Sequence, residues 1–418
     1  MTEHADLLRR FQPQLRYDSN EAFFCDSAAE WTDNPGNVLR RTVGGKPGDV
    51  IAATAPATGP AQLSLAFLAA SAYDGGKAVD KDDAISAPTR NYRAMYVALR
   101  QRPGYKNRMY GRAKEDAKGR LWLQYWFFYF YNDYNLAGGV GLHEGDWEMV
   151  QFRMAPPEQG ERPDLAVYAQ HIHAEQAPWE DVEKSPDNPN TPLVYVARGS
   201  HASYFKAGYH ETEAWYDIAD GKRNTPKLEL EIIGDDPPGW ILWPGRWGDT
   251  RPRVVGIDQP SPRGPGTKTQ WDDPEKLCDR ARTHARSAAL PAPDVDVKRR
   301  QGRLVVEFDF SKRVGPKPER LVMTVNSRDD NIQPRTFTFA LEPALRGTID
   351  TRFEAVDRQR YDVYLSVTDN QGRPSESRLV LIAALGEKRS LIDRVGPRIG
   401  RVAGDVAKAL DGLRRRRK

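Results

Sequence analysis

The chain of 418 residues contains only two cysteines, Cys25 and Cys278, which lie far apart in the sequence. A framework of several disulfides is therefore excluded, although one disulfide is not. No run of about 18 apolar residues occurs, so no transmembrane helix is predicted. The opening residues lack the apolar core and cleavage site of a conventional secretion signal. We expect a protein of the cytoplasm, or one exported without such a signal, that can associate peripherally with a membrane.

The net charge of +4 hides an uneven distribution along the chain. Residues 387–418 carry a net charge of +7, whereas residues 1–386 carry −3. A mildly acidic body makes nucleic acid an unfavourable partner. Apolar residues recur at helical spacing across 390–413 among basic residues, and RRRRK ends the sequence. This pattern predicts a basic amphipathic helix that contacts anionic membrane. The alternatives are a helix docked on the protein itself, or one that binds nucleic acid or a partner groove.

Residues 1–289 are predicted to form a β-sandwich domain with peripheral helices and long loops. Alternation and β-branched or aromatic residues predict strands at 121–132, 146–154, 165–173 and 192–199. The aromatic run at 125–131 is typical of a buried strand, with a stacking platform for bases or sugars as the alternative. Other features expected here are helices at 61–72 and 274–289, and Pro-rich loops at 174–192 and 234–270.

A second group of strands follows a linker at 290–296. Strand-like runs occur at 303–310, 320–327, 335–342, 349–355, 361–369 and 378–385. Closely spaced short strands predict a smaller sandwich of fibronectin III or immunoglobulin type across 290–386, and the absence of a Cys–Trp–Cys pattern favours the fibronectin form. The chain is therefore predicted to be mainly β, and the basic segment 387–418 follows its two sandwiches. The second sandwich is a candidate surface for protein partners.

Histidine is scarce but clustered, because five of the seven lie between positions 143 and 210. In the motif GLHEGDWE, strand alternation puts Asp146 and Glu148 on one face. Carboxylates so close together repel unless a positive group lies between them, and a divalent cation would serve. A turn at the preceding glycines could bring His143 to the same site. Such ligands favour Mg²⁺, Ca²⁺ or Mn²⁺ over Zn²⁺. The alternative is that arginines pair with the carboxylates and His143 caps a turn.

Three further histidines are candidate ligands or general bases. His171 and His173 are expected to share one face of a predicted strand, with ordinary half-exposed histidines as the alternative. His201 lies among small residues in RGSHASYF, so the backbone can approach whatever the ring faces. The adjacent Ser200 is not expected to pair with His201, because neighbouring strand residues point apart. The sequence contains neither the nucleophile motif G-x-S-x-G nor a phosphate loop.

Four blocks of the sequence resemble the vacuolar protein sorting-associated protein 62 family of fungi, plants and bacteria. In order, they are LQYWFFYFYNDYN, GLHEGDWEMVQFRM, VYAQHIHAE and PLVYVARGSHASYF. The opening FQPQLRYDSNEAFF is similar as well, so the resemblance covers about residues 8–285. The combination of GDWE with GSHASY is its most specific part. The resemblance implies membrane association or trafficking more than catalysis.

A more distant similarity is to the necrosis- and ethylene-inducing-peptide-like cytolysins, whose hallmark reads GHRHDWE. Aligned on DWE, the first His, the Asp and the Glu of that family fall on His143, Asp146 and Glu148. The similarity implies that these residues hold a divalent cation beside a β-sandwich surface that engages sphingolipid head groups. An upstream acidic ligand would fall near Asp133. Gly145 stands where that family has its second His, so cytolytic activity is not carried over to this chain.

Three functions follow as hypotheses. The favoured one is a cation-dependent binding or targeting protein for anionic or glycosylated lipid head groups, in trafficking or as a toxin-like effector. Its candidate binding residues are Asp133, His171, His173, His201 and Tyr204. The second is a hydrolase of a phosphoester or glycan, in which a metal activates water and His171 or His201 acts as base. The third is an interaction protein without a metal. No complete catalytic set is apparent, which favours binding over catalysis.

Overall fold

The computed structural model describes residues 4–43, 46–54, 61–73, 77–134, 141–171, 173–211, 216–224, 228–249, 261–284, 293, 295–311, 317–327, 335–341, 345–370, 375 and 377–385. The chain is mainly β, as the sequence predicts. Two large hydrophobic cores form among the described residues, one within residues 8–277 and the other within residues 295–382, and a small third cluster lies within residues 193–219.

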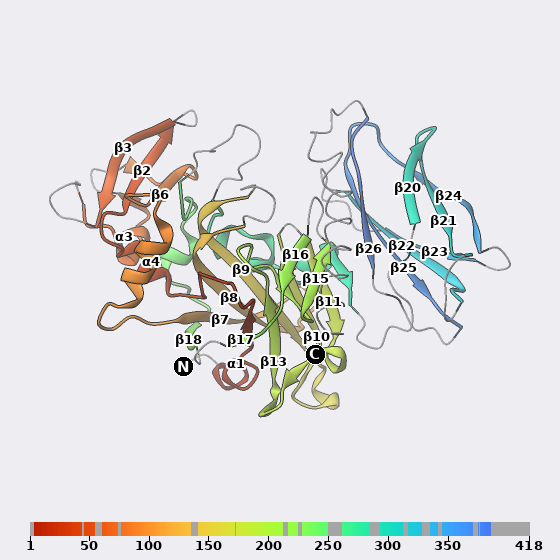
Figure 1. The fold of residues 1–418 in the computed structure, drawn as a ribbon, viewed down its shortest axis with the longest axis horizontal. Coiled ribbons are helices and arrows are strands. Elements are labelled where there is room, and N and C mark those ends of the chain that lie inside the picture. The colour runs from red at the N-terminus through yellow and green to blue at the C-terminus, as the bar shows by residue number, and fades with distance from the viewer. Residues whose placement is uncertain are drawn as a thin grey trace, which may run out of the picture.

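A seven-stranded sheet forms the centre of the first core (Figure 1). Its inner pairs are antiparallel, and the pairs at its two edges are parallel. In spatial order the strands are β18 (Glu229–Ile233), β7 (Arg108–Glu115), β8 (Leu121–Asn132), β9 (His143–Met154), β10 (Pro163–Gln170), β11 (His173–Pro178) and β19 (Ala281–Thr283).

A second, smaller sheet packs against one face of the central sheet. Its strands are β12 (Lys184–Ser185), β13 (Asn188–Val196), β1 (Gln14–Tyr17) and β17 (Arg223–Asn224), with β14 (Ser203–Tyr204) paired to β13. Leu15 and Val194 from this sheet share the core with Tyr125 and Phe152 of the central sheet. The two sheets therefore form the sandwich that the sequence predicts.

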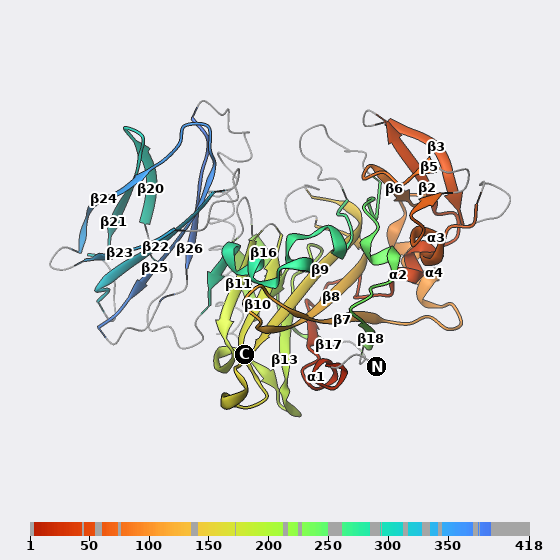
Figure 2. The same cartoon turned by 180° about the vertical axis from the view of Figure 1, so that it is seen from behind.

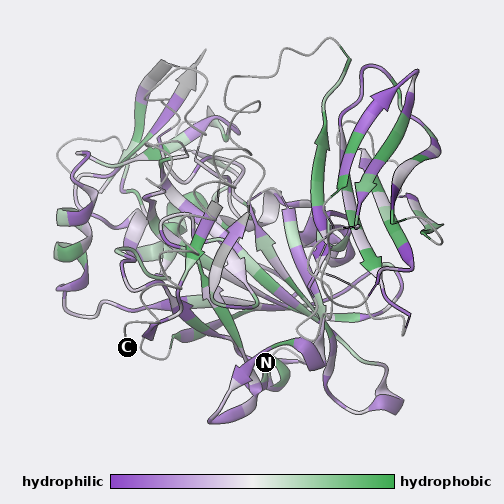
Figure 3. Cartoon of the chain, turned by 45° about the vertical axis from the view of Figure 1, so that its right-hand side comes forward, coloured by the Kyte–Doolittle hydropathy of each residue, from purple (hydrophilic) through white to green (hydrophobic). Residues whose placement is uncertain are grey.

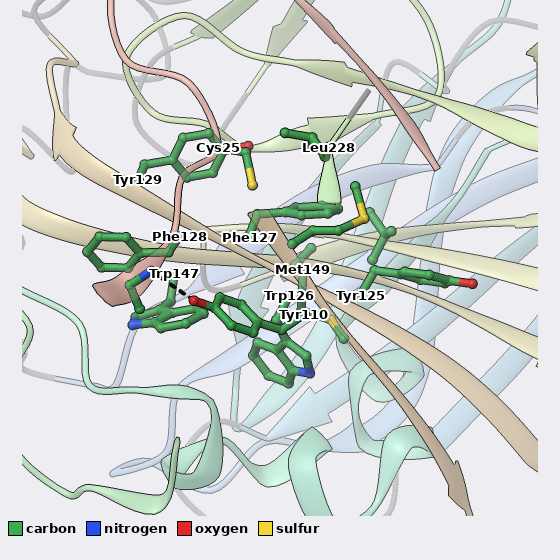
Figure 4. Close-up of a cluster of buried hydrophobic side chains, with 14 of the residues drawn as sticks. Cys25, Tyr110, Tyr125, Trp126, Phe127, Phe128, Tyr129, Trp147, Met149 and Leu228 are labelled. Carbon is green, nitrogen blue, oxygen red and sulfur yellow. Dashed lines mark hydrogen bonds between the residues drawn. The ribbon is translucent and has the colours of Figure 1, made fainter. Parts of the chain in front are cut away.

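The central sheet is buried on both faces, because the loop-rich segments 234–249 and 261–280 cover the face opposite β1 and β13. Figure 4 shows aromatic side chains on both sides of the strands, including Trp126 and Trp147. Trp147 packs edge-on against Trp247, and Trp126 contacts Trp271. All of β8 except its first residue is buried. The aromatic run at 125–131 is thus part of a buried strand rather than a stacking platform.

Short elements surround the sandwich (Figure 2). Three strands form a small outer sheet: β3 (Lys46–Ala53), β2 (Val38–Val43) and β6 (Asp83–Ser86). Two hairpins are β4 (Ala72–Tyr73) with β5 (Lys77–Ala78), and β15 (Gly208–Glu211) with β16 (Tyr216–Ala219). The α-helices are α1 (Ala5–Arg10), α2 (Ala28–Thr32), α3 (Leu65–Leu68), α4 (Tyr92–Arg100) and α5 (Thr269–Asp272). The 3-10 helices are η1 (Pro157–Gln159), η2 (Trp179–Asp181), η3 (Gly239–Leu242), η4 (Pro265–Thr267) and η5 (Pro274–Arg280).

Three local predictions for the first sandwich are wrong. The expected loop at 174–192 contains most of β11, together with β12 and the start of β13. The expected helix at 274–289 is the 3-10 helix η5 followed by β19, which completes the edge of the central sheet. Within 61–72, only the four residues of α3 are helical. Pairing with neighbouring strands outweighs local propensity in the first two segments.

The second core lies between two sheets of fibronectin III-like arrangement. One sheet contains β20 (Val295–Arg300), β21 (Arg303–Asp309) and β24 (Arg346–Glu354), and the other β23 (Arg335–Ala340), β22 (Arg320–Ser327), β25 (Tyr361–Thr368) and β26 (Arg378–Ile382). Figure 3 shows hydrophobic and hydrophilic residues alternating along these strands. Their inward side chains, such as Leu304 and Leu365, are buried.

The two sandwiches touch through β11, η5 and β19 of the first. The Tyr364 hydroxyl of β25 donates a hydrogen bond of 2.7 Å to the carbonyl of Arg280. The Asn326 amide donates to the carbonyl of Asp279 at 3.0 Å, and Ser377 and Thr283 exchange two hydrogen bonds. The predicted basic helix and tail at 387–418 lie outside the described residues. Among the described helices, none has the length and apolar character needed to cross a membrane.

Asp116 holds the turn between β7 and β8 and supplies a test of this fold. The Asp116 carboxylate accepts hydrogen bonds from the backbone N–H groups of Lys118 and Arg120, the Arg120 guanidinium, and the Trp122 indole at 2.9 Å. Burial opposes ionisation, but these donors outweigh burial and lower the pKa of Asp116 to about 2.

We expect Asp116→Asn to lower the free energy of unfolding at pH 7 by about 2 kcal/mol, because hydrogen bonds to a charged group are lost. The pKa of Asp116 is lower in the folded chain than in the unfolded one. Its contribution is therefore complete above the unfolded value near 3.8 and is lost as the pH falls toward about 2. Urea unfolding at several pH values measures both effects. A constant difference between wild type and variant from pH 7 to pH 2 would contradict this assignment.

Candidate functional site

The loop that joins β13 to β14 carries His201 into the interior of the first sandwich. The loop closes through a hydrogen bond of 2.9 Å from Ala197 N–H to the carbonyl of Ala202. His201 has φ of 57°, a left-handed backbone conformation that is uncommon for residues other than glycine. Gly199 has φ of 75°, and a Cβ there would lie 2.4 Å from the carbonyl oxygen of Asp133, so only glycine fits.

His201 is fully buried between two carboxylates. Its Nδ1 donates to Oδ2 of Asp146 at 3.0 Å, and its Nε2 lies 3.7 Å from Oε1 of Glu21. The ring stacks on Tyr129 with centroids 3.9 Å apart. Burial disfavours the charged ring, but Glu21 and Asp146 outweigh burial and raise the pKa of His201 to about 9. His201 is therefore an internal cation at neutral pH, and the pKa values of both carboxylates are lowered despite their burial.

His143 lies beside the other oxygen of Asp146. The distance from Nε2 of His143 to Oδ1 of Asp146 is 3.9 Å. Nδ1 of His143 is 3.0 Å from the carbonyl oxygen of Gly145, and because a carbonyl only accepts, Nδ1 carries the hydrogen. Burial lowers the pKa of His143, which leaves Nε2 with a free lone pair. A hydrogen bond from the other ring nitrogen is the usual arrangement of a metal-binding histidine.

Gly145 is required at its position. It has φ of 55° and interrupts the pairing of β8 with β9 between Glu144 and Asp146. A Cβ on Gly145 would lie 2.3 Å from the carbonyl oxygen of Trp247. A histidine, which the cytolysin motif GHRHDWE has at this position, therefore does not fit in place of Gly145 in this backbone.

Glu148 is a buried carboxyl group that makes no hydrogen bond or ion pair with the described residues. It lies two positions along β9 from Asp146, on the same face, and only 8% of the residue is exposed. No hydrogen bond or ion pair reaches its carboxyl group within the described part of the chain. Burial and the charge of Asp146 raise the pKa of Glu148 well above its usual range, although the positive charges of His171, Lys268 and His201 act in the opposite direction. The alternative that arginines pair with Asp146 and Glu148 is therefore not realised among the described residues.

A second imidazole–carboxylate pair lies next to the first. Nε2 of His171 is 3.0 Å from Oδ2 of Asp217, which also accepts from the Tyr204 hydroxyl at 2.7 Å. The other Asp217 oxygen accepts from the Ser200 hydroxyl at 2.9 Å. The His171 side chain is 29% exposed, in contrast to His201. Burial lowers the pKa of His171, but Asp217 more than offsets this and raises it to about 9.

The structure separates several residues that the sequence groups together. His171 follows β10 in a turn with φ of 54°, and His173 begins β11, so the expectation that they share a strand face is wrong. His173 contacts the second sandwich instead, with Nδ1 3.0 Å from the Tyr364 hydroxyl. The Asp133 carboxylate forms an ion pair of 2.7 Å with Arg93, and only its backbone approaches the His201 loop.

Sequence reasoning missed three residues of this cluster: Glu21, Asp217 and Tyr129. Glu21 comes from a loop near the start of the chain, and both Oε1 and Oε2 accept backbone hydrogen bonds, including one of 2.6 Å from Gly199 N–H. Asp217 lies on the short strand β16. No spacing rule connects these positions with GDWE. The only available signal for Glu21 was the similarity of the opening block.

A polar cavity of about 360 Å³ adjoins the cluster at His143. Its wall is formed by β2, the end of β6 and the residues after it, the start of α4, the end of β8 and the start of β9. Its lining includes Arg40, Ser86, Thr89, Arg90, Tyr92, Tyr131, His143, Glu144 and Asp249. Within the described ranges, no three His, Cys, Asp or Glu side chains converge as they would around a bound metal ion. Binding an ion would therefore require a side chain such as Glu148 to move.

The chain is similar in sequence to two known proteins, but only distantly. No family model matches the chain. TDA6 of Saccharomyces cerevisiae, named as a vacuolar protein sorting-associated protein, is 27% identical over 200 residues, which cover 37% of this chain and 40% of TDA6. Vacuolar protein sorting-associated protein 62 of the same yeast is 26% identical over 184 residues, or 32% of this chain and 37% of that protein. The chain is a distant relative of these two proteins. It spans about two fifths of their length.

Among solved structures, similarity is confined to small parts of the chain. The fibronectin III domain of human collagen alpha-1(XX) chain matches at 14% identity, covering 26% of this chain and 97% of that domain, with a TM-score of 0.20. A family 76 glycoside hydrolase from Bacteroides thetaiotaomicron matches at 16% identity over 22% of this chain and 20% of the hydrolase, with a TM-score of 0.19.

We expect His201→Gln to reduce the free energy of unfolding by about 3–5 kcal/mol, because Asp146 and Glu21 would stay buried without their cation. The equivalent change at His4, before α1, should stay within about 0.5 kcal/mol of wild type. Urea unfolding followed by tryptophan fluorescence measures both. If both variants unfold at the same urea concentration as wild type, His201 does not neutralise the two carboxylates.

Proposed function

We propose that the protein binds anionic or glycosylated lipid head groups through a divalent cation held by His143, Asp146 and Glu148. The observation that carries this proposal is Glu148, a buried carboxyl group that has no hydrogen bond or ion pair among the described residues and lies beside a second carboxylate. Without a ligand, burial favours the protonated form of Glu148, and a divalent cation would displace that proton and supply the missing positive charge. Mg²⁺, Ca²⁺ and Mn²⁺ suit oxygen-rich ligands better than Zn²⁺ does.

The donor atoms around Asp146 support this proposal. Oδ2 of Asp146 is used by His201, whereas Oδ1 faces Nε2 of His143, whose lone pair is free. One carboxylate oxygen, one imidazole nitrogen and the Glu148 carboxyl group are thus available. The cation would supply a positive charge that bridges these side chains to a negative or hydroxyl-rich ligand. His201 would keep Asp146 in place during binding.

Binding is better supported than hydrolysis. Both nitrogens of His201 face carboxylates and its ring is stacked on Tyr129, so His201 cannot reach a substrate. His171 is more exposed, but Asp217 keeps it protonated at neutral pH, and a protonated ring cannot act as a general base. Neither of the two histidines that the hydrolase hypothesis names as base is therefore suited to that role.

The distant relatives and the basic segment favour a membrane setting. Both yeast proteins carry vacuolar sorting in their names, which is consistent with a role in trafficking. Residues 387–418 would add electrostatic attraction to anionic lipid. The second sandwich, with its separate core, would offer a surface for protein partners.

Glu148→Gln provides the sharpest test of the cation. We expect the variant to unfold at the same temperature as wild type or a higher one without metal, because it removes an unpaired buried carboxyl group. Wild type should gain thermal stability with millimolar Ca²⁺, Mg²⁺ or Mn²⁺, and the variant should not. Differential scanning fluorimetry measures both. Glu158→Gln, an exposed position in η1, is the matched control and should respond to metal like wild type. An equal metal-induced shift in all three proteins would contradict the site.

A second prediction concerns residues 387–418. We expect flotation with vesicles of phosphatidylcholine and phosphatidylserine to fall strongly when these residues are deleted, and to weaken for the full chain as salt rises. The metal-induced gain in thermal stability should survive the deletion, since it depends on β9. Undiminished flotation of the shortened chain at every salt concentration would show that the basic segment does not attract the membrane.

A further inference from the structure

The cavity next to His143 has a wall whose unused polar groups are mostly positive or hydroxyl-bearing. Arg90 is exposed and forms no hydrogen bond or ion pair among the described residues. Arg40 donates only a long hydrogen bond of 3.4 Å to the carbonyl of Gly48. Ser86 and Thr89 add hydroxyl groups to the same wall, and the Thr89 hydroxyl, which accepts from Asn91 N–H at 3.3 Å, still has its own hydrogen to donate. Two guanidinium groups with adjacent hydroxyls match the oxygens of a phosphate group.

The acidic residues of the wall restrict how much negative charge the ligand can carry, and they do not form a second cation site. Oε1 of Glu144 accepts from the Tyr92 hydroxyl at 2.8 Å, and Oε2 accepts from the backbone N–H groups of Ala87 and Asp249. Both oxygens of Glu144 are therefore occupied. These contacts tie α4 and the segment after β6 to the start of β9, which shapes the cavity. Asp249 lines the same wall and would repel a ligand with several phosphates.

The size and the aromatic wall narrow the ligand further. The volume of about 360 Å³ lies at the lower end of the range for small-molecule sites. The rings of Tyr92 and Tyr131 stack with centroids 3.9 Å apart, and Tyr92 is held by its bond to Glu144. These rings give the cavity a rigid side against which the carbon atoms of a small polyol can pack.

We propose that this cavity binds a phosphate monoester that carries hydroxyl groups, with Arg40 and Arg90 on the phosphate. This proposal rests on the proposed function, because it assumes that the protein binds a head group. It adds that the head group carries a phosphate and hydroxyl groups. His143 lines the cavity and also faces Asp146, so the phosphate would lie beside the cation site. A lipid head group and a free sugar or glycerol phosphate share this chemistry.

Titration calorimetry of the full chain with glycerol 3-phosphate tests the proposal, with and without millimolar Ca²⁺. We expect saturable binding that weakens about tenfold or more in Arg90→Gln and in Arg40→Gln, as for loss of a charged hydrogen bond. Arg162→Gln, in the exposed turn between β9 and β10, makes the same charge change and should bind like wild type. Glycerol alone should not bind. Arg90 is exposed, so its variant should fold normally, and melting curves verify this.

Each outcome has a defined meaning. Absence of binding by wild type, or equal binding by all variants, would overturn the cavity assignment. If Ca²⁺ itself still binds in that case, the proposed cation function stands. Binding of glycerol 3-phosphate that depends on both arginines, in a protein that binds no Ca²⁺, would support the cavity and overturn the cation. Flotation with phosphatidylcholine vesicles containing phosphatidic acid separates the two sources. If flotation is lost in Arg90→Gln but not in Arg162→Gln, the ligand is a lipid head group. If the protein binds glycerol 3-phosphate but does not float with these vesicles, the ligand is a free metabolite.

Discussion

The buried contact of His201 with Asp146 and Glu21 is the constraint on which the site depends. It joins the β13–β14 loop, the start of β9 and a loop near the beginning of the chain. The imidazolium neutralises carboxylates that could not otherwise be buried together. It also forces His201 into a left-handed backbone conformation, which the stack on Tyr129 and the close fit of Gly199 help to maintain. Strain of this kind at a buried charge cluster is typical of a functional site.

This constraint determines which groups remain available. Because His201 uses one oxygen of Asp146, the other oxygen, His143 and Glu148 are the donors left for a ligand. The pair of His171 with Asp217 supports the same loop through Ser200. The cavity lined by Arg40 and Arg90 lies on the other side of His143. The protonated rings of His201 and His171 and the carboxyl group of Glu148 thus lie at different places within one connected cluster.

The sequence predicts the fold better than the site. The strands at 121–132 and 320–327 match β8 and β22 residue for residue, because each is a run rich in aromatic or β-branched residues. The strand β11 and the edge strand β19 could not be predicted, because their pairing partners, not their residues, make them strands. Alternation correctly places Asp146 and Glu148 on one face of β9. Nothing local could reveal that Glu21 and Asp217, far apart in the chain, complete the cluster.

The most direct measurement of the central claim is anomalous scattering from a crystal of the full chain soaked in Mn²⁺. We expect one strong peak bounded by Nε2 of His143, Oδ1 of Asp146 and the carboxyl group of Glu148, with the Glu148 side chain turned toward the ion. His201 should stay on Oδ2 of Asp146 in that crystal. A map without a peak at these three residues, in a crystal where Mn²⁺ is bound elsewhere or not at all, would contradict the account.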